Sequence, residues 1–191
     1  MLNHRHALAG LVTVAALTAN AGAAILVFTT SMDGPSEAPP VASPGIGTST
    51  ITWDTALNTM RVQANFSGLV GTTTVAHIHA SATMIPFTGT SGVATPTPSF
   101  PLWPTGVQAG SYDRTFDMTL ASSFNAAFIT ANGGTPASAA AVLLGTLQTG
   151  RAYFNVHSTF APGGEIRGFF PTPGAATLLG IAGVAALRRR R

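Results

Sequence analysis

The chain has 191 residues, contains no cysteine, and carries a charged side chain at only 8% of its positions. The absence of cysteine excludes disulfides, thiolate zinc sites and thiol nucleophiles. The net charge of +3 depends on the arginine cluster at 188–191, and without it the acids outnumber the basic residues, so no nucleic-acid-binding surface is predicted.

Residues 1–24 have the three zones of a secretory signal peptide. Residues 4–6 supply a charged start, an apolar run covers 7–19, and small residues at 19–24 offer cleavage sites. The apolar run is shorter than the roughly 20 residues of a membrane-spanning helix. We therefore predict that the export machinery secretes the protein. The alternative is a buried N-terminal helix.

Between residues 25 and 170, apolar and polar side chains alternate, which is the pattern of half-buried strands. Met60, Val62 and Phe66, for example, fall on one face, and Arg61 falls on the other. Together with 21 glycines and 13 prolines, this alternation predicts an all-β, turn-rich extracellular domain. The predicted strands cover 25–32, 48–54, 59–69, 73–80, 111–120, 151–158 and 164–170.

Two alanine-rich segments interrupt the alternation before the last two strands. They predict short helices over 123–131 and 136–147. Ser122 or Ser123 can cap the first helix, and Pro136 suits the first turn of the second.

Proline-rich segments at 35–40 and 94–104 predict loops, because proline lacks the backbone N–H that a sheet needs. The second segment is long and contains Trp103. We expect this side chain to pack back against the domain. The alternative is an exposed contact residue.

Several blocks of the sequence occur in an order that resembles the CHRD domain, a module first named for chordin and found in bacterial secreted proteins. The resemblance covers about 28–170. It implies a Greek-key β-sandwich or barrel, immunoglobulin-like or superoxide-dismutase-like, with no established enzymatic reaction. The blocks are M-D-G-P-S-E-A-P-P-V-A-S-P-G-I-G-T at 32–48, F-S-G-L at 66–69, V-A-H-I-H-A at 75–80, N-A-A-F-I-T-A-N-G-G at 125–134 and R-A-Y-F-N-V-H-S-T-F-A-P-G-G-E-I-R-G-F-F at 151–170.

Three histidines lie on two of the predicted strands, opposite their aliphatic neighbours. If the aliphatic sides face the core and the strands are adjacent, His77, His79 and His157 gather on the other face. Histidines at i and i+2 of a strand are about 6.6 Å apart, so two tilted imidazoles can share one copper or zinc ion. A firm site needs a third ligand, from His157 or Glu165. The alternatives are hydrogen bonds to loop backbone and Asn155 that only stabilise the fold, or catalysis.

The candidate polar cluster that supports the histidines consists of Asn155, Glu165 and Arg167. Glu165 and Arg167 share a strand face, which predicts either a surface ion pair or a buried bridge beneath the histidines. Ser158 follows His157, but neither a nucleophile elbow nor a base-orienting acid accompanies it. A hydrolase is therefore not predicted, and no catalytic residue is assigned.

The C-terminal segment 171–191 has three parts that resemble the PEP-CTERM sorting signal of bacterial surface proteins. An apolar segment followed by a cationic stop holds a C-terminus on the cytoplasmic side during export. The resemblance implies transient membrane insertion and processing by an exosortase-type protease, although Thr172 replaces the usual glutamate. The alternative is a permanent anchor, for which the apolar run is short. The parts are Pro171, Thr172, Pro173 and Gly174, the apolar run 175–187, and Arg188, Arg189, Arg190 and Arg191.

These observations divide the chain into a signal peptide (1–24), a CHRD-like β domain (25–170) and a sorting signal (171–191). We expect a non-enzymatic module at the cell surface or in the extracellular matrix of a bacterium, which needs no cofactor. Extracellular polysaccharide or surface proteins are the expected partners, and nucleic acid is not. The alternative function is a histidine-based copper or zinc site with a metal-binding or redox role.

Overall fold

The computed structural model describes residues 23–171. Every predicted strand and both predicted helices are present, with small differences at their ends. The elements are β1 (Ile25–Asp33), β2 (Ile46–Asp54), β3 (Thr59–Ser67), β4 (Thr73–Ala80), β5 (Gly110–Asp117), the 3-10 turn η1 (Ala121–Ser123), α1 (Ala126–Ala131), α2 (Pro136–Gln148), β6 (Ala152–Ser158) and β7 (Ile166–Phe169).

The two predicted end segments lie outside the described part of the chain, apart from residues 23, 24 and 171. Residue Ala24 already belongs to the domain, because its backbone exchanges hydrogen bonds with Thr55. Within 23–171, no helix is long and apolar enough to cross a membrane.

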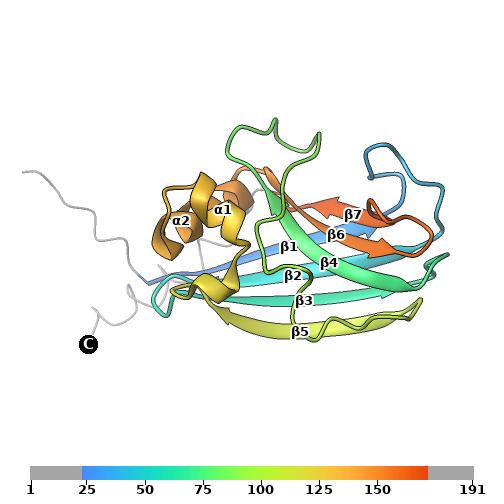
Figure 1. The fold of residues 1–191 in the computed structure, drawn as a ribbon, viewed down its shortest axis with the longest axis horizontal. Coiled ribbons are helices and arrows are strands. Elements are labelled where there is room, and N and C mark those ends of the chain that lie inside the picture. Colours follow the sequence, from blue (N-terminus) through green and yellow to red (C-terminus); the bar gives the residue numbers. More distant parts are fainter. Residues whose placement is uncertain (1–22, 172–191) are drawn as a thin grey trace, which may run out of the picture.

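All seven strands form one antiparallel sheet in the order β4-β6-β7-β1-β2-β3-β5, which curls into a half-barrel (Figure 1). The strands β1, β2 and β3 form a meander that is paired along its full length. Strand β7 returns from the end of the chain and lies beside β1, where Arg167 pairs with Asp33. The all-β prediction is confirmed, with a single curled sheet as its architecture.

The apolar face of the sheet forms the core. In β3 every second side chain is buried, including Met60, Val62 and Phe66, as the alternation predicts. The long loop 81–109 contributes to the same core, because Trp103 stacks on Phe66 with ring centroids 5.3 Å apart. The prediction that Trp103 packs against the domain is confirmed.

Helices α1 and α2 cover one end of the half-barrel (Figure 1). The predicted cap at Ser122 or Ser123 is wrong, because Asn125 caps α1 and accepts from the Ala127 amide at 3.0 Å. Ser123 instead lies in η1, where its hydroxyl donates to the Asp117 carbonyl at 2.6 Å. The chain turns once after β5 before the helix begins, so the cap moves downstream. Pro136 does lie in the first turn of α2.

Strand β6, most of β7 and the second half of β4, from Ala76 to Ala80, are buried on both faces. Every residue of β6 is buried, whereas the outward-facing residues of β3 are exposed or only half-buried. Three segments cover the outer face of these strands, and we call them the covering loops: 34–45, 81–99 and 159–165. Side chains that point away from the core here are therefore removed from water.

Candidate metal centre

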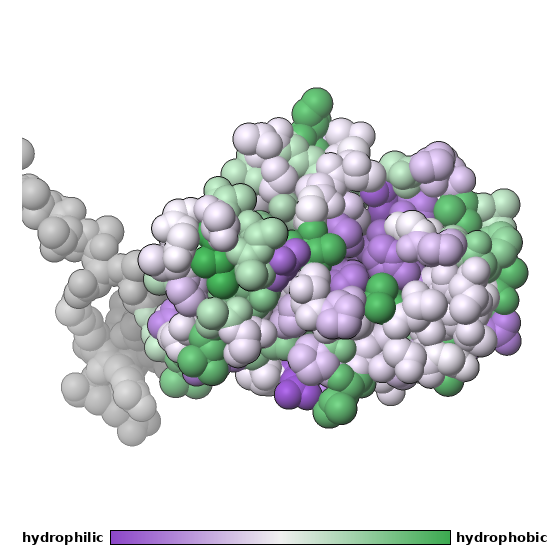
Figure 2. Space-filling view, in the orientation of Figure 1, coloured by the Kyte–Doolittle hydropathy of each residue, from purple (hydrophilic) through white to green (hydrophobic). Residues whose placement is uncertain are grey.

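The register of the sheet gathers polar side chains beneath the covering loops. His77 pairs with Asn155 across β4 and β6, and Asn155 pairs with Arg167 across β6 and β7. In the next row, His79 pairs with Tyr153. Because directly paired residues point to the same face, these side chains form one continuous outer surface of the sheet. Figure 2 shows hydrophilic residues gathered over the region where β4, β6 and β7 lie in Figure 1.

The structure brings the three predicted histidines together. One ring nitrogen from each of His77, His79 and His157 lies within 4.8 Å of the other two. The ring centroids are 5.4 to 6.0 Å apart. The side chains are only 5%, 9% and 9% exposed. Of the two third ligands that the sequence offers, His157 joins the group and Glu165 does not.

A backbone carbonyl from a covering loop fixes the proton on each ring. Nε2 of His77 lies 2.8 Å from the Pro98 carbonyl, Nδ1 of His79 lies 2.8 Å from the Ser91 carbonyl, and Nδ1 of His157 lies 2.9 Å from the Pro162 carbonyl. A carbonyl oxygen only accepts, so each of these nitrogens carries its hydrogen and donates. Metal-binding histidines hold their second nitrogen in the same way.

The other nitrogen of each ring is therefore an unprotonated lone pair. His77 Nδ1 and His157 Nε2 face each other at 3.5 Å, and with these tautomers neither has a hydrogen to donate. His79 Nε2 is buried without any hydrogen-bond partner. Two buried acceptors thus face each other without a donor, and a third lies unpaired on the neighbouring ring, which is unfavourable unless another species binds there.

The spacing of these nitrogens suits one metal ion. Two imidazole nitrogens at about 2.0 Å from one ion are roughly 3.3 to 3.6 Å apart at tetrahedral or trigonal angles. The distance of 3.5 Å between His77 Nδ1 and His157 Nε2 falls in this range. The widest separation, at most 4.8 Å, closes by a movement of about 1 Å in one ring.

The same burial keeps the imidazoles neutral. Desolvation lowers the pKa of His77 to about 4 and that of His79 to about 4, and the hydrogen bonds from their rings to the carbonyls only partly offset it. Burial also lowers the pKa of His157, again against the effect of its carbonyl. At neutral pH all three rings are therefore in the form that binds metal.

Glu165 has a structural position apart from the histidines. Its carboxylate accepts from Ser43 Oγ and the Val70 amide, each at 2.6 Å, from the Gly71 amide at 3.2 Å, and from Ser158 Oγ. Burial would raise the pKa of Glu165, but these four hydrogen bonds outweigh it and lower the pKa. The predicted pairing of Glu165 with Arg167 is wrong, because loop amides and hydroxyls already satisfy this carboxylate.

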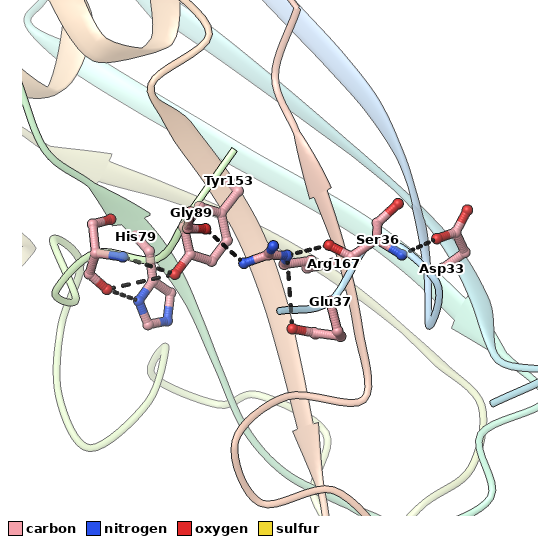
Figure 3. A network of polar contacts seen from close by, with 8 residues as sticks. Asp33, Ser36, Glu37, His79, Gly89, Tyr153 and Arg167 are labelled. Carbon is pink, nitrogen blue, oxygen red and sulfur yellow. Dashed lines mark hydrogen bonds and ion pairs between the residues drawn. The ribbon is translucent and has the colours of Figure 1, made fainter. Parts of the chain in front are cut away.

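Arg167 instead pairs with Glu37, which the sequence did not single out. The Nε of Arg167 lies 3.8 Å from Oε2 of Glu37, and its guanidinium donates to the Ser36 and Gly89 carbonyls (Figure 3). Burial raises the pKa of Glu37 to about 7, and the charge of Arg167 and a hydrogen bond from Ala38 only partly oppose this. Glu37 lies in a proline-rich loop without periodicity, so no sequence pattern indicates it.

A stack of three side chains connects Arg167 to the histidines. The ring of Tyr153 lies parallel to that of His79, with centroids 4.8 Å apart and an interplanar angle of 6°. The guanidinium carbon of Arg167 lies 4.9 Å from the centre of the same tyrosine ring (Figure 3). Asn155, between His77 and Arg167 in the sheet, has a buried Oδ1 without a partner.

Comparison with known families matches most of the domain. A sequence model described as the CHRD domain matches residues 28–170, a range that contains the whole three-histidine group. Searches of curated proteins and of solved structures returned no match.

Proposed function

This chain belongs to the CHRD domain family, and on that premise we propose that it is an extracellular module that binds one copper or zinc ion at His77, His79 and His157. Family membership suggests a binding-type module. The observation that carries the proposal is the convergence of three buried imidazoles, each of which donates one ring N–H to a carbonyl of a covering loop and has an unprotonated second nitrogen. Imidazole is a good ligand for both metals.

The purely structural alternative explains less of the geometry. If the histidines only stabilised the fold, a proton between His77 and His157 would make the contact favourable. The Pro98 and Pro162 carbonyls already hold the single hydrogen of each neutral ring, so no such proton is present. The lone pair of His79 would also stay buried without a partner. One bound ion removes both difficulties.

The proposed role is binding rather than catalysis. Asn155 pairs with His77 in the sheet, Tyr153 stacks on His79, and Arg167 lies over Tyr153. These side chains suit positioning better than nucleophilic or general-base chemistry. Glu165 is saturated by hydrogen bonds and has no free oxygen to act as a base.

We further propose that the module works outside a bacterial cell, at the surface or in the matrix, with polysaccharide or surface proteins as its partners. The zones of residues 1–24 and the proline-to-arginine pattern of 171–191 support export and processing by an exosortase-type protease. The intact mass of the secreted protein tests this. A mass that still includes residues 175–191 would contradict the sorting step.

Metal analysis tests the centre itself. Residues 23–171 contain no histidine besides these three, so an untagged protein of this range reports on this site alone. We expect one equivalent of copper or zinc after dialysis, and at least a hundredfold weaker binding in His77→Ala and His157→Ala. The control is Gln63→His, which adds one histidine on the exposed face of β3 and should leave the stoichiometry unchanged. Wild-type protein without a stoichiometric metal would disprove the proposal.

A further inference from the structure

The three-histidine centre supplies no negative charge to a bound ion. Its ligands are three neutral imidazoles, and no carboxylate of residues 23–171 belongs to the group. The side chains are at most 9% exposed, so water screens the ion poorly. The cost of placing an ion in such surroundings grows with the square of its charge, so a divalent ion loses about four times as much solvation energy as a monovalent one.

A fixed positive charge lies close to the centre. The stack of Arg167, Tyr153 and His79 places the guanidinium carbon no more than about 10 Å from the His79 ring, through protein rather than through water.

Glu37 offsets this charge incompletely. Its nearer oxygen lies 3.8 Å from Arg167, and with a pKa of about 7 the carboxyl is only partly ionised at neutral pH. The field of Arg167 therefore persists at the centre, and it repels a divalent ion more than a monovalent one.

The number of ligands also favours a monovalent ion over a divalent one. Zinc in proteins is almost always four-coordinate, so at these three nitrogens zinc(II) would need a water molecule as its fourth ligand. Copper(I) accepts three ligands in one plane and needs no fourth. Imidazole by itself suits both metals, so charge and coordination number decide between them.

We infer that the three-histidine centre selects monovalent copper over zinc(II) and copper(II). This inference rests on the proposed metal-binding function and adds the identity and oxidation state of the ion. The chain lacks the thiolates that select copper(I) in many other proteins. Here three neutral imidazole ligands beside the buried guanidinium of Arg167 take the place of thiolates in selecting copper(I).

Competition titrations of the untagged β domain test the selectivity. Copper(I) is titrated without oxygen against bathocuproine disulfonate, and zinc(II) and copper(II) are titrated separately against chelators of known affinity. We expect one equivalent of copper(I) with a Kd at least tenfold lower than those of the two divalent ions. Divalent binding as tight as that of copper(I) would overturn the selectivity and leave the metal site standing. Failure of all three ions to bind would overturn the metal site itself.

Variants of the buried ion pair test the charge argument. Arg167→Met combined with Glu37→Gln removes both charges without leaving either one buried alone. Because Glu37 is only partly ionised at neutral pH, the pair carries roughly half a unit of net positive charge. Its loss at about 10 Å changes the preference between monovalent and divalent ions by about threefold, so we expect the ratio of copper(I) to zinc(II) affinity to fall by that factor. Glu37→Gln alone retains the arginine and should keep or increase the ratio. An unchanged ratio in the double variant would refute a role for Arg167.

Discussion

The same substitution should destabilise the domain strongly at one buried glutamate and only slightly at the other. In Glu165→Gln, one carboxylate oxygen becomes an amide NH2 that cannot accept. Oε1 accepts from Ser43 Oγ and the Val70 amide, and Oε2 accepts from the Gly71 amide and Ser158 Oγ. A hydroxyl can rotate to accept from the new NH2, but a backbone N–H cannot. Either orientation of the glutamine therefore leaves one backbone N–H facing another donor.

The cost follows from these contacts. One unsatisfied buried amide and the loss of charge from the remaining hydrogen bonds together destabilise the domain by about 3 kcal/mol. In Glu37→Gln the outcome differs, because Glu37 Oε1 has no partner and burial has already raised the pKa of this carboxyl to about 7. The neutral amide removes that desolvation penalty and weakens one long ion pair, while Arg167 keeps its hydrogen bonds to the Ser36 and Gly89 carbonyls, so we expect a change below about 1 kcal/mol at pH 7.

Urea unfolding at pH 7, followed by the fluorescence of the buried Trp53 and Trp103, measures both free energies of unfolding. A shift of the midpoint without a change of slope identifies a pure stability effect. A loss below 1 kcal/mol in Glu165→Gln, or equal losses in the two variants, would refute the account of these two carboxyl groups.

Three other outcomes are expected. In metal-free Glu37→Gln, the free energy of unfolding should fall by roughly 5 kcal/mol from pH 7 to pH 4.5, because His77 and His79 have a pKa of about 4 when folded and 6.5 as the ordinary value, so the unfolded chain binds more protons in that window. Glu37 is removed because its raised pKa acts in the opposite direction, and a flat pH profile of urea midpoints would contradict the prediction. Gly164→Ala should cost about 2 kcal/mol or more in the same assay, since φ is +132° and the new Cβ would lie 2.6 Å from Glu37 Oε1, whereas an unchanged midpoint would argue against this packing. Asn125→Ala should lower the free energy of unfolding by about 1 kcal/mol, because α1 loses its N-cap, whereas Ser122→Ala should leave it almost unchanged. Equal effects of the two variants on the melting temperature would count against the assigned cap.

Local patterns explain how much of this structure could be predicted. The alternation of Met60, Val62, Ala64 and Phe66 requires only that neighbouring side chains of a strand point to opposite faces. The same rule placed His77 and His79 on the side away from the core. It could not indicate Glu37, which reaches Arg167 from a loop 130 residues earlier in the chain, because no periodicity links a loop to a strand.

The amino-acid sequence by itself determined the all-β class, the positions of the strands and helices, and the face on which each histidine lies. These properties depend on local alternation, on turn residues and on apolar content, all of which lie within a few residues of one another. The sequence also contains the blocks by which the family is identified, between residues 28 and 170.

Only the tertiary structure decided which side chains meet. Adjacency of β4 and β6 brings together His77 and His157, which are 80 positions apart, and the covering loops add the carbonyls that set their tautomers. In the folded domain, Glu165 accepts from the Val70 and Gly71 amides, and Arg167 pairs with Glu37. The sequence had instead suggested that Glu165 and Arg167, at positions i and i+2, pair with each other. Burial is the physical reason: once loops remove this face from water, each charge must take the partner that satisfies its hydrogen bonds, and sequence spacing no longer decides.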